Sequence, residues 1–119
     1  MKRLLLFISF LTSFVSFNAQ NDYYMRQTKS YQREAEYYTN QAQSYDKEVA
    51  YYNHQAQVYL READYYSNRE KYDQVRRYLR KAKDASDMAE SYKKKADYAM
   101  DKAKSYMQKA ENAFQKAKK

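Results

Sequence analysis

Residues 23–64 consist of three consecutive, similar copies of a 14-residue unit: YYMRQTKSYQREAE, YYTNQAQSYDKEVA and YYNHQAQVYLREAD. Through these units and just beyond them a tyrosine recurs every seven residues from Tyr24 to Tyr66, and alanine or valine follows most of these tyrosines four positions later. Alternating steps of four and three residues form the heptad pattern of a coiled-coil helix, here with tyrosine at position d and a small residue at position a. The stretch therefore predicts one long helix with a seam of tyrosine and alanine.

A second seam occupies the C-terminal half of the chain. Alanine recurs every seven residues from Ala82 to Ala117, and the positions three residues later are alanine or tyrosine. The two seams are out of phase by five residues, an offset that a continuous coiled coil absorbs poorly. A break is therefore expected between them, where Ser67-Asn68-Arg69-Glu70 has the spacing of a capping box and Asn68 is the candidate for a left-handed residue. The pattern predicts a helix over about 21–67, a turn over about 67–72 and a helix over about 72–117.

The predicted fold class is all-α, an antiparallel two-helix coiled-coil hairpin. If the chain reverses near residue 70, residues whose numbers sum to about 141 lie opposite each other, and nearly every tyrosine ring faces a small residue, as dense packing requires. Two chains with unbroken helices that pair antiparallel about the same centre are the alternative. The predicted core seam consists of Tyr24, Tyr31, Tyr38, Tyr45, Tyr52, Tyr59, Ala82, Ala89, Ala96, Ala103 and Ala110.

Charged residues beside the seam predict the same register. In the antiparallel pairing, three glutamates face three lysines: Glu34 with Lys109, Glu48 with Lys95, and Glu62 with Lys81. An exposed ion pair contributes about 0.5 kcal/mol, so these predicted pairs would select the register and add little to stability.

Residues 1–19 have the features of a cleaved secretory signal peptide. Lys2 and Arg3 precede an apolar run over residues 4–17, and Ala19 is a small residue before the predicted cut. The predicted mature domain is the hairpin over 20–119, exported to the periplasm, the cell surface or the extracellular space; an uncleaved anchor is the alternative. The chain has no cysteine, which excludes disulfides, thiolate metal sites and a lipidated cysteine. It also has no glycine, which disfavours β-rich folds and phosphate-binding loops.

Charge is distributed unevenly along the predicted mature chain. Residues 21–67 hold five basic and seven acidic residues, whereas residues 68–119 hold 16 basic and eight acidic residues. The basic half favours an anionic polymer, a cell wall or a membrane surface as partner, and export argues against nucleic acid. The candidate interaction surface combines tyrosines at position c, apolar residues at position e and two basic residues: Tyr23, Tyr37, Tyr51, Tyr65, Met100, Met107, Phe114, Lys93 and Lys94.

The sequence does not predict an enzyme, a cofactor, a metal site or a small-molecule substrate. His54 falls at the outermost heptad position, and Glu34, Glu48 and Glu62 are spaced about 21 Å apart along a helix, too far to act as an acid and base pair. The first functional hypothesis is an exported structural protein that self-associates or spaces envelope or matrix components, with adhesion or tyrosine cross-linking as further roles. The alternative is a binding module that presents a basic helix face to an acidic protein, polysaccharide or lipid surface.

Overall fold

The computed structural model describes residues 19–118, which form two helices: α1 (Ala19–Ser67) and α2 (Tyr72–Ala117). These helices hold almost every residue between 19 and 118, and that range contains no strand. The predicted all-helical class with two long helices is confirmed. Residues 1–18 of the predicted signal peptide lie outside the described residues. Neither helix of the described range is long and apolar enough to cross a membrane.

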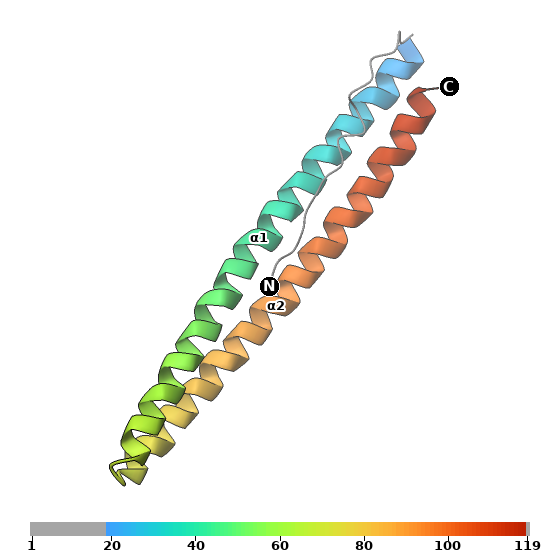
Figure 1. Ribbon diagram of the computed structural model, residues 1–119. Coiled ribbons are helices and arrows are strands. Elements are labelled where there is room, and N and C mark those ends of the chain that lie inside the picture. Colours follow the sequence, from blue (N-terminus) through green and yellow to red (C-terminus); the bar gives the residue numbers. More distant parts are fainter. Residues whose placement is uncertain (1–18, 119) are drawn as a thin grey trace. The chain divides into compact units, whose positions relative to one another are not determined.

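The two helices form a helical hairpin that divides into two compact units. The described part of the first unit is residues 43–96, and that of the second is residues 19–42 together with 97–118. In each unit a segment of α1 lies beside a segment of α2 and runs antiparallel to it (Figure 1). The first unit contains the turn that joins the helices.

The turn closes α1 with backbone hydrogen bonds. The N–H of Lys71 donates to the carbonyl of Tyr66, and the N–H of Glu70 donates to the carbonyl of Ser67, each over 3.0 Å. Glu70 has a φ of 57°, in the left-handed region. These two bonds, together with the left-handed conformation of Glu70, constitute a Schellman motif. The motif satisfies carbonyls at the end of α1 that have no partner within the helix.

This turn differs from the predicted one in two respects. The left-handed residue is Glu70 and not Asn68, because Asn68 still continues the helical pattern and donates its N–H to the carbonyl of Asp64 over 3.0 Å. The predicted capping box at Ser67 is also wrong, since Ser67 is the last residue of α1. At the start of α2, the N–H of Val75 donates to the carbonyl of Lys71 over 3.1 Å.

The core is built from small side chains. Alanine and valine at the predicted a positions of α1 are at most 6% exposed, and the alanines at positions a and d of α2 are equally buried. The seam tyrosines are only half-buried, because two helices alone cover only part of such a large side chain. The largest fully buried side chain of the described range is Thr28, which donates its hydroxyl to the carbonyl of Tyr24 over 2.8 Å. Thr39 is likewise buried and donates to the carbonyl of Ala35 over 2.7 Å.

Candidate interaction surface

Tyrosines from both helices meet in three groups, here called the tyrosine triplets. In each triplet one tyrosine of α2 lies between two tyrosines of α1 that are one heptad apart. Within the first unit Tyr92 lies between Tyr45 and Tyr52, with ring centroids 6.0 and 5.8 Å away. The other two triplets are Tyr59, Tyr66 and Tyr78 in the first unit, and Tyr31, Tyr38 and Tyr106 in the second.

The triplets agree in geometry. The centroid distances are 6.0–6.2 Å to the earlier α1 tyrosine and 5.5–5.8 Å to the later one, where the rings are stacked within 8–10°. In the predicted register each α2 ring faces a small residue, and the rings of neighbouring layers then touch one another. These contacts between layers were not predicted. Tyr78 was also missed, although it lies two heptads before Tyr92 in the sequence.

The three predicted ion pairs are absent, and their lysines contact tyrosine rings instead. Within residues 19–118, Glu34, Glu48 and Glu62 form no ion pair with the lysines that were predicted to face them. The ammonium groups lie over the α2 rings of the triplets: Lys81 over Tyr78 at 5.2 Å, Lys95 over Tyr92 at 5.0 Å, and Lys109 over Tyr106 at 4.9 Å. The physical reason is proximity, because each lysine is three residues from its ring on one helix face, whereas its glutamate lies on the other helix.

A second set of tyrosines, here called the outer tyrosines, lies at position c of α1. Tyr23, Tyr37, Tyr51 and Tyr65 are 51%, 55%, 54% and 47% exposed. Each packs edge-to-face against the seam tyrosine that follows it, with centroids 5.0–5.3 Å apart and planes 68–90° apart. The edge-to-face arrangement is the favoured geometry of an aromatic pair. The outer tyrosines therefore expose about half their surface while their rings have a packing partner.

Polar residues four positions later hold several outer tyrosines in place. Nε2 of Gln27 donates to the hydroxyl of Tyr23, and Nε2 of Gln41 donates to the hydroxyl of Tyr37, both over 3.0 Å. After the third repeat, Arg69 stands at this position relative to Tyr65, and its guanidinium carbon lies 3.7 Å from the Tyr65 ring centroid. In the first two copies of the 14-residue unit, a glutamine at the same position thus orients the exposed ring of the outer tyrosine.

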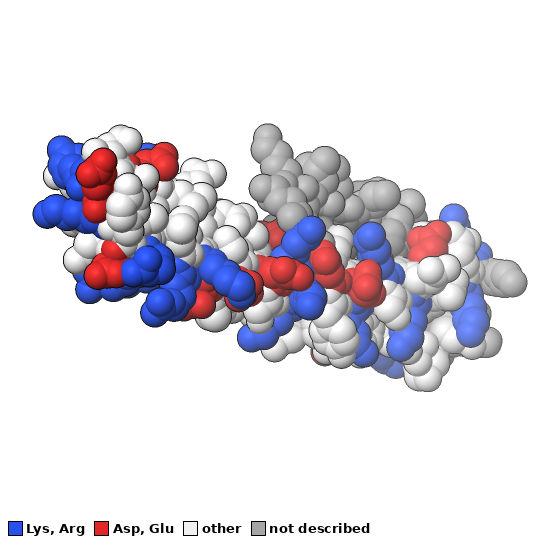
Figure 2. Space-filling model, turned by 90° about the horizontal axis from the view of Figure 1, so that it is seen from below, with Lys and Arg blue, Asp and Glu red and all other residues white. Residues whose placement is uncertain are grey.

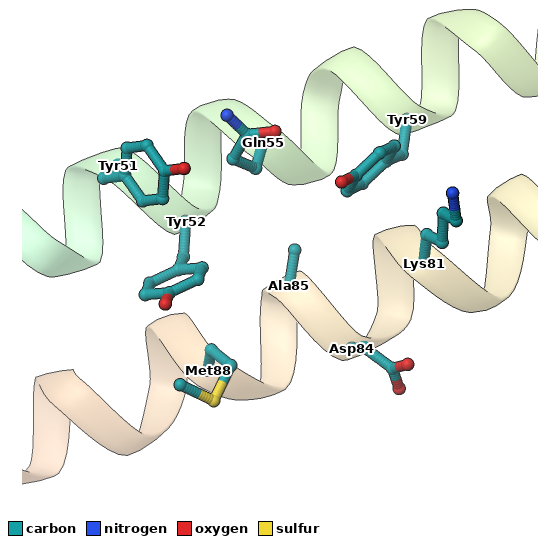
Figure 3. A pocket seen from close by; sticks show the side chains of 8 residues that line it. All are labelled: Tyr51, Tyr52, Gln55, Tyr59, Lys81, Asp84, Ala85 and Met88. Atoms are coloured by element: carbon teal, nitrogen blue, oxygen red, sulfur yellow. The ribbon is translucent and has the colours of Figure 1, made fainter.

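A hollow of about 310 Å³ opens beside the outer tyrosine Tyr51, within the first unit. Figure 3 shows the α1 residues on one side of it and the α2 residues on the other. Three aromatic rings and a methionine share this lining with polar and charged groups, which were not predicted to gather here. The lining residues are Tyr51, Tyr52, Gln55, Tyr59, Lys81, Asp84, Ala85 and Met88.

Tyr52 connects this hollow to a tyrosine triplet. Burial raises the pKa of the Tyr52 phenol above its ordinary value, and the nearby phenols of Tyr92 and Tyr51 and the carboxylate of Glu48 raise it further. Each of these neighbours disfavours a phenolate at this place because it is, or becomes, negatively charged. The electrostatic environment of the Tyr52 ring therefore opposes negative charge.

The apolar part of the predicted surface is not exposed as expected. Phe114 is 3% exposed and belongs to the core, while Met100 and Met107 are half-buried. Ala110 and Ala117 flank Phe114 one helical turn away on either side, and such small side chains leave room for the ring to pack inward. Phe114 is therefore removed from the candidate surface.

Basic and acidic side chains are mixed on the surface. Lys93 and Lys94 of the candidate interaction surface are exposed, and Nζ of Lys94 lies 3.9 Å from Oε1 of Glu90. Lys83 pairs with Asp87 over 2.9 Å, a hydrogen bond that raises the pKa of Lys83. On the face drawn in Figure 2, lysine and arginine alternate with aspartate and glutamate and do not gather in one block. Such pairing along one helix reduces the field that a distant anion meets.

The described range holds one histidine and no cysteine. His54 is exposed, at the outer face of α1. Between residues 19 and 118 no group of three histidine, aspartate or glutamate side chains is placed to hold a metal ion. Comparison with protein-family models, with curated proteins and with solved structures found no match to this chain. The features of the described range that bear on function are the two sets of tyrosines and the hollow beside them.

Proposed function

We propose that the chain is an exported, non-enzymatic structural protein, whose antiparallel coiled coil with a tyrosine and alanine seam self-associates through the outer tyrosines. The observation that carries this proposal is the repeated, half-exposed and oriented set of Tyr23, Tyr37, Tyr51 and Tyr65. Tyrosine is enriched in protein interfaces because its ring buries apolar area while its hydroxyl keeps a polar partner.

The order of these rings favours association. A side chain that becomes immobilised in an interface costs about 0.5–1.5 kcal/mol of conformational entropy. The hydroxyls of Tyr23 and Tyr37 already accept hydrogen bonds from glutamines, and the rings already pack on their neighbours. Part of this entropy cost is therefore met when the helix folds.

The spacing of the rings favours a second copy as the partner. Tyr23 and Tyr37 in the second unit, like Tyr51 and Tyr65 in the first, are two heptads apart, about 21 Å along a helix. A second copy carries the same spacing, so one ring-to-ring contact brings the next into register. A symmetric interface of this kind uses the same surface on both molecules.

Sedimentation velocity at several protein concentrations tests self-association. The variant carries Tyr→Gln at 23, 37, 51 and 65, and the matched control carries Tyr→Gln at 72 and 98, which are 58% and 63% exposed on α2. The natural chain and the control are expected to form larger species as concentration rises, and the variant is expected to stay monomeric with unchanged helical circular dichroism. Assembly of the variant equal to that of the control would contradict the proposal.

Export is tested separately by mass spectrometry of the protein recovered outside the cytoplasm of a secreting host. The expected mature chain begins at Gln20, after the predicted signal peptide. A full-length chain retained inside the cells would contradict this part of the proposal.

A second candidate function is a binding module that presents α2 to an acidic partner. The excess of basic residues in 68–119 and the exposure of Lys93 and Lys94 favour it. A monomeric chain that binds polyglutamate or dextran sulfate, with affinity that falls steeply as salt rises, would support this function over self-association. The charge-reversal variant Lys93→Glu with Lys94→Glu is expected to weaken that binding and to leave the concentration dependence of sedimentation unchanged.

A further inference from the structure

Ammonium groups over tyrosine rings form a regular row along α2, here called the lysine row. Its positions are one heptad apart, at 81, 88, 95, 102, 109 and 116, and lysine occupies all of them except 88, which is methionine. Each of the five lysines places its ammonium 4.9–5.7 Å from the centroid of a tyrosine ring. An ammonium within about 6 Å of a ring centroid is attracted by the negative face of the ring.

The exception at Met88 is informative because an equivalent position exists in the other unit. Tyr24 and Tyr52 are both seam tyrosines of α1, and the four heptads between them match the four heptads between Met88 and Lys116 on α2. Lys116 lies over Tyr24, with its ammonium 5.7 Å from the ring centroid. At the equivalent place beside Tyr52 the chain offers the uncharged thioether of Met88, and no lysine or arginine within residues 19–118 lies over that ring.

The hollow described above lies at this place. Tyr52 and Met88 both line it, together with the rings of Tyr51 and Tyr59 and the carboxylate-bearing Asp84 (Figure 3). Its volume of about 310 Å³ has room for a short alkyl chain that ends in an ammonium. Aromatic faces attract an organic cation by cation–π forces.

The one cation already present lies at the far side of the hollow. Lys81 places its ammonium 5.7 Å from the Tyr59 ring and 5.2 Å from the Tyr78 ring. Asp84 is three residues from Lys81 on α2, so its negative charge offsets that of Lys81. On the side of Tyr51 and Tyr52, the hollow therefore has aromatic surface and no basic side chain.

We infer that this hollow binds the alkylammonium group of a lysine-type side chain, which then occupies over Tyr52 the place that Lys116 occupies over Tyr24. The occupant is identified by the two contacts in which a lysine of α2 lies over a ring of α1, Lys116 over Tyr24 and Lys81 over Tyr59. The inference does not depend on self-association, because the ammonium group can belong to a second copy or to another molecule.

The direct test is a nuclear magnetic resonance titration of the full chain with n-butylammonium chloride, and with 1-butanol as the uncharged probe of similar size. The reporters are the methyl group of Met88 and the ring signals of Tyr51 and Tyr52. Saturable shifts are expected with n-butylammonium, and 1-butanol is expected to bind about two- to fivefold more weakly, the factor that one cation–π contact at an open site supplies. Equal binding of the two probes would overturn the inference.

Two substitutions sharpen the test by exchanging the equivalent residues. Met88→Lys completes the lysine row, so the shifts at Tyr51 and Tyr52 are expected to disappear, while Met107→Lys, outside the hollow, is expected to leave them unchanged. Lys116→Met is expected to create a second binding position, reported by the ring signals of Tyr24. Circular dichroism of each variant checks that the helices are intact. Undiminished binding by a folded Met88→Lys variant would overturn the inference.

The source of the ammonium group is distinguished without added ligand. If a lysine of a second copy enters the hollow, the Met88 methyl signal shifts as the protein concentration rises, and n-butylammonium reverses that shift. If the signal does not change with protein concentration while n-butylammonium still binds, the natural occupant comes from another molecule. A sedimentation variant with Tyr→Gln at 23, 37 and 65 only, which keeps Tyr51 in the hollow, tests self-association independently of both results.

Discussion

Tyr92 of α2 is stacked on Tyr52 of α1, with ring centroids 5.8 Å apart and ring planes 9° apart. The same near-parallel stacking joins Tyr106 to Tyr38 and Tyr78 to Tyr66. An aromatic pair contributes about 0.5–1.5 kcal/mol beyond the area that it buries. Because the neighbouring alanines bury little apolar area, these rings carry much of the contact between the helices within each unit.

Removal of a triplet ring should destabilise the hairpin. We expect Tyr92→Ala to lower the free energy of unfolding by about 2–4 kcal/mol, slightly less than for a fully buried aromatic ring, because Tyr92 is half-buried and contacts two rings. Urea titrations followed by circular dichroism measure this change. Tyr98→Ala is the control, since this ring is 63% exposed, and we expect a change within about 0.5 kcal/mol. Similar effects of the two substitutions would show that the triplets do not hold the helices together.

The lysines beside the triplets should act through rings and not through carboxylates. Lys95→Met keeps most of the alkyl stem and removes the ammonium that lies 5.0 Å from the Tyr92 centroid, so we expect a loss of about 0.5–1 kcal/mol. Glu48→Gln should change stability by less than about 0.5 kcal/mol. A double-mutant cycle of Lys95→Met with Tyr92→Leu isolates the contact. A coupling energy of zero in that cycle, or a larger effect of Glu48→Gln, would restore the ion pair as the main interaction.

The turn offers a stabilising substitution. A left-handed conformation costs a residue with a Cβ atom about 1–2 kcal/mol, and glycine does not pay this cost. Glycine also adds entropy to the unfolded chain, which offsets part of the gain, so Glu70→Gly should raise the free energy of unfolding by about 1 kcal/mol. Ser67→Ala should have little effect, because Ser67 contributes its carbonyl to the turn. Chemical denaturation measures both variants. A strong loss of stability in Ser67→Ala would instead favour the capping box.

Alkaline pH should weaken the hairpin through Tyr52. Its pKa is raised in the folded chain, first by burial, so the contribution to stability is complete below the unfolded pKa of about 10 and is lost as pH rises through the folded value. Urea midpoints between pH 8 and pH 11.5 should therefore fall less steeply in Tyr52→Phe than in the natural chain. Tyr98→Phe, at an exposed ring, should follow the natural chain. Identical slopes for all three proteins would refute the role of Tyr52.

Much of this fold follows from heptad spacing, whereas the contacts at its surface do not. The period of seven places Tyr45 and Ala96 on helix faces that meet, and the phase break near residue 70 indicates where one helix ends. The spacing does not say whether a long side chain such as Lys95 reaches a carboxylate on the other helix or a ring on its own. That choice depends on rotamers and local distances, and here the ring three residues away is the partner. The burial of Phe114 was missed for a similar reason, because a heptad position does not specify how a ring turns.

The identity of the left-handed residue was missed on different grounds. Asparagine tolerates this conformation better than glutamate, which made Asn68 the natural candidate. The Schellman motif instead fixes the residue by its distance from the last helical carbonyls, so Glu70 adopts it despite its side chain. Backbone hydrogen bonding outweighs intrinsic preference at this position.

The four-residue connection has a consequence for alignment. In the first unit the triplets of Tyr78 and Tyr92 are two heptads apart on both helices. Two separate peptides, residues 43–67 and 72–96, would therefore have a second possible pairing. In that pairing one helix is shifted by two heptads along the other, and one triplet still forms. Residues 68–71 are too short to permit that slide. The short connection between the helices thus selects one alignment of a periodic interface that would otherwise allow more than one.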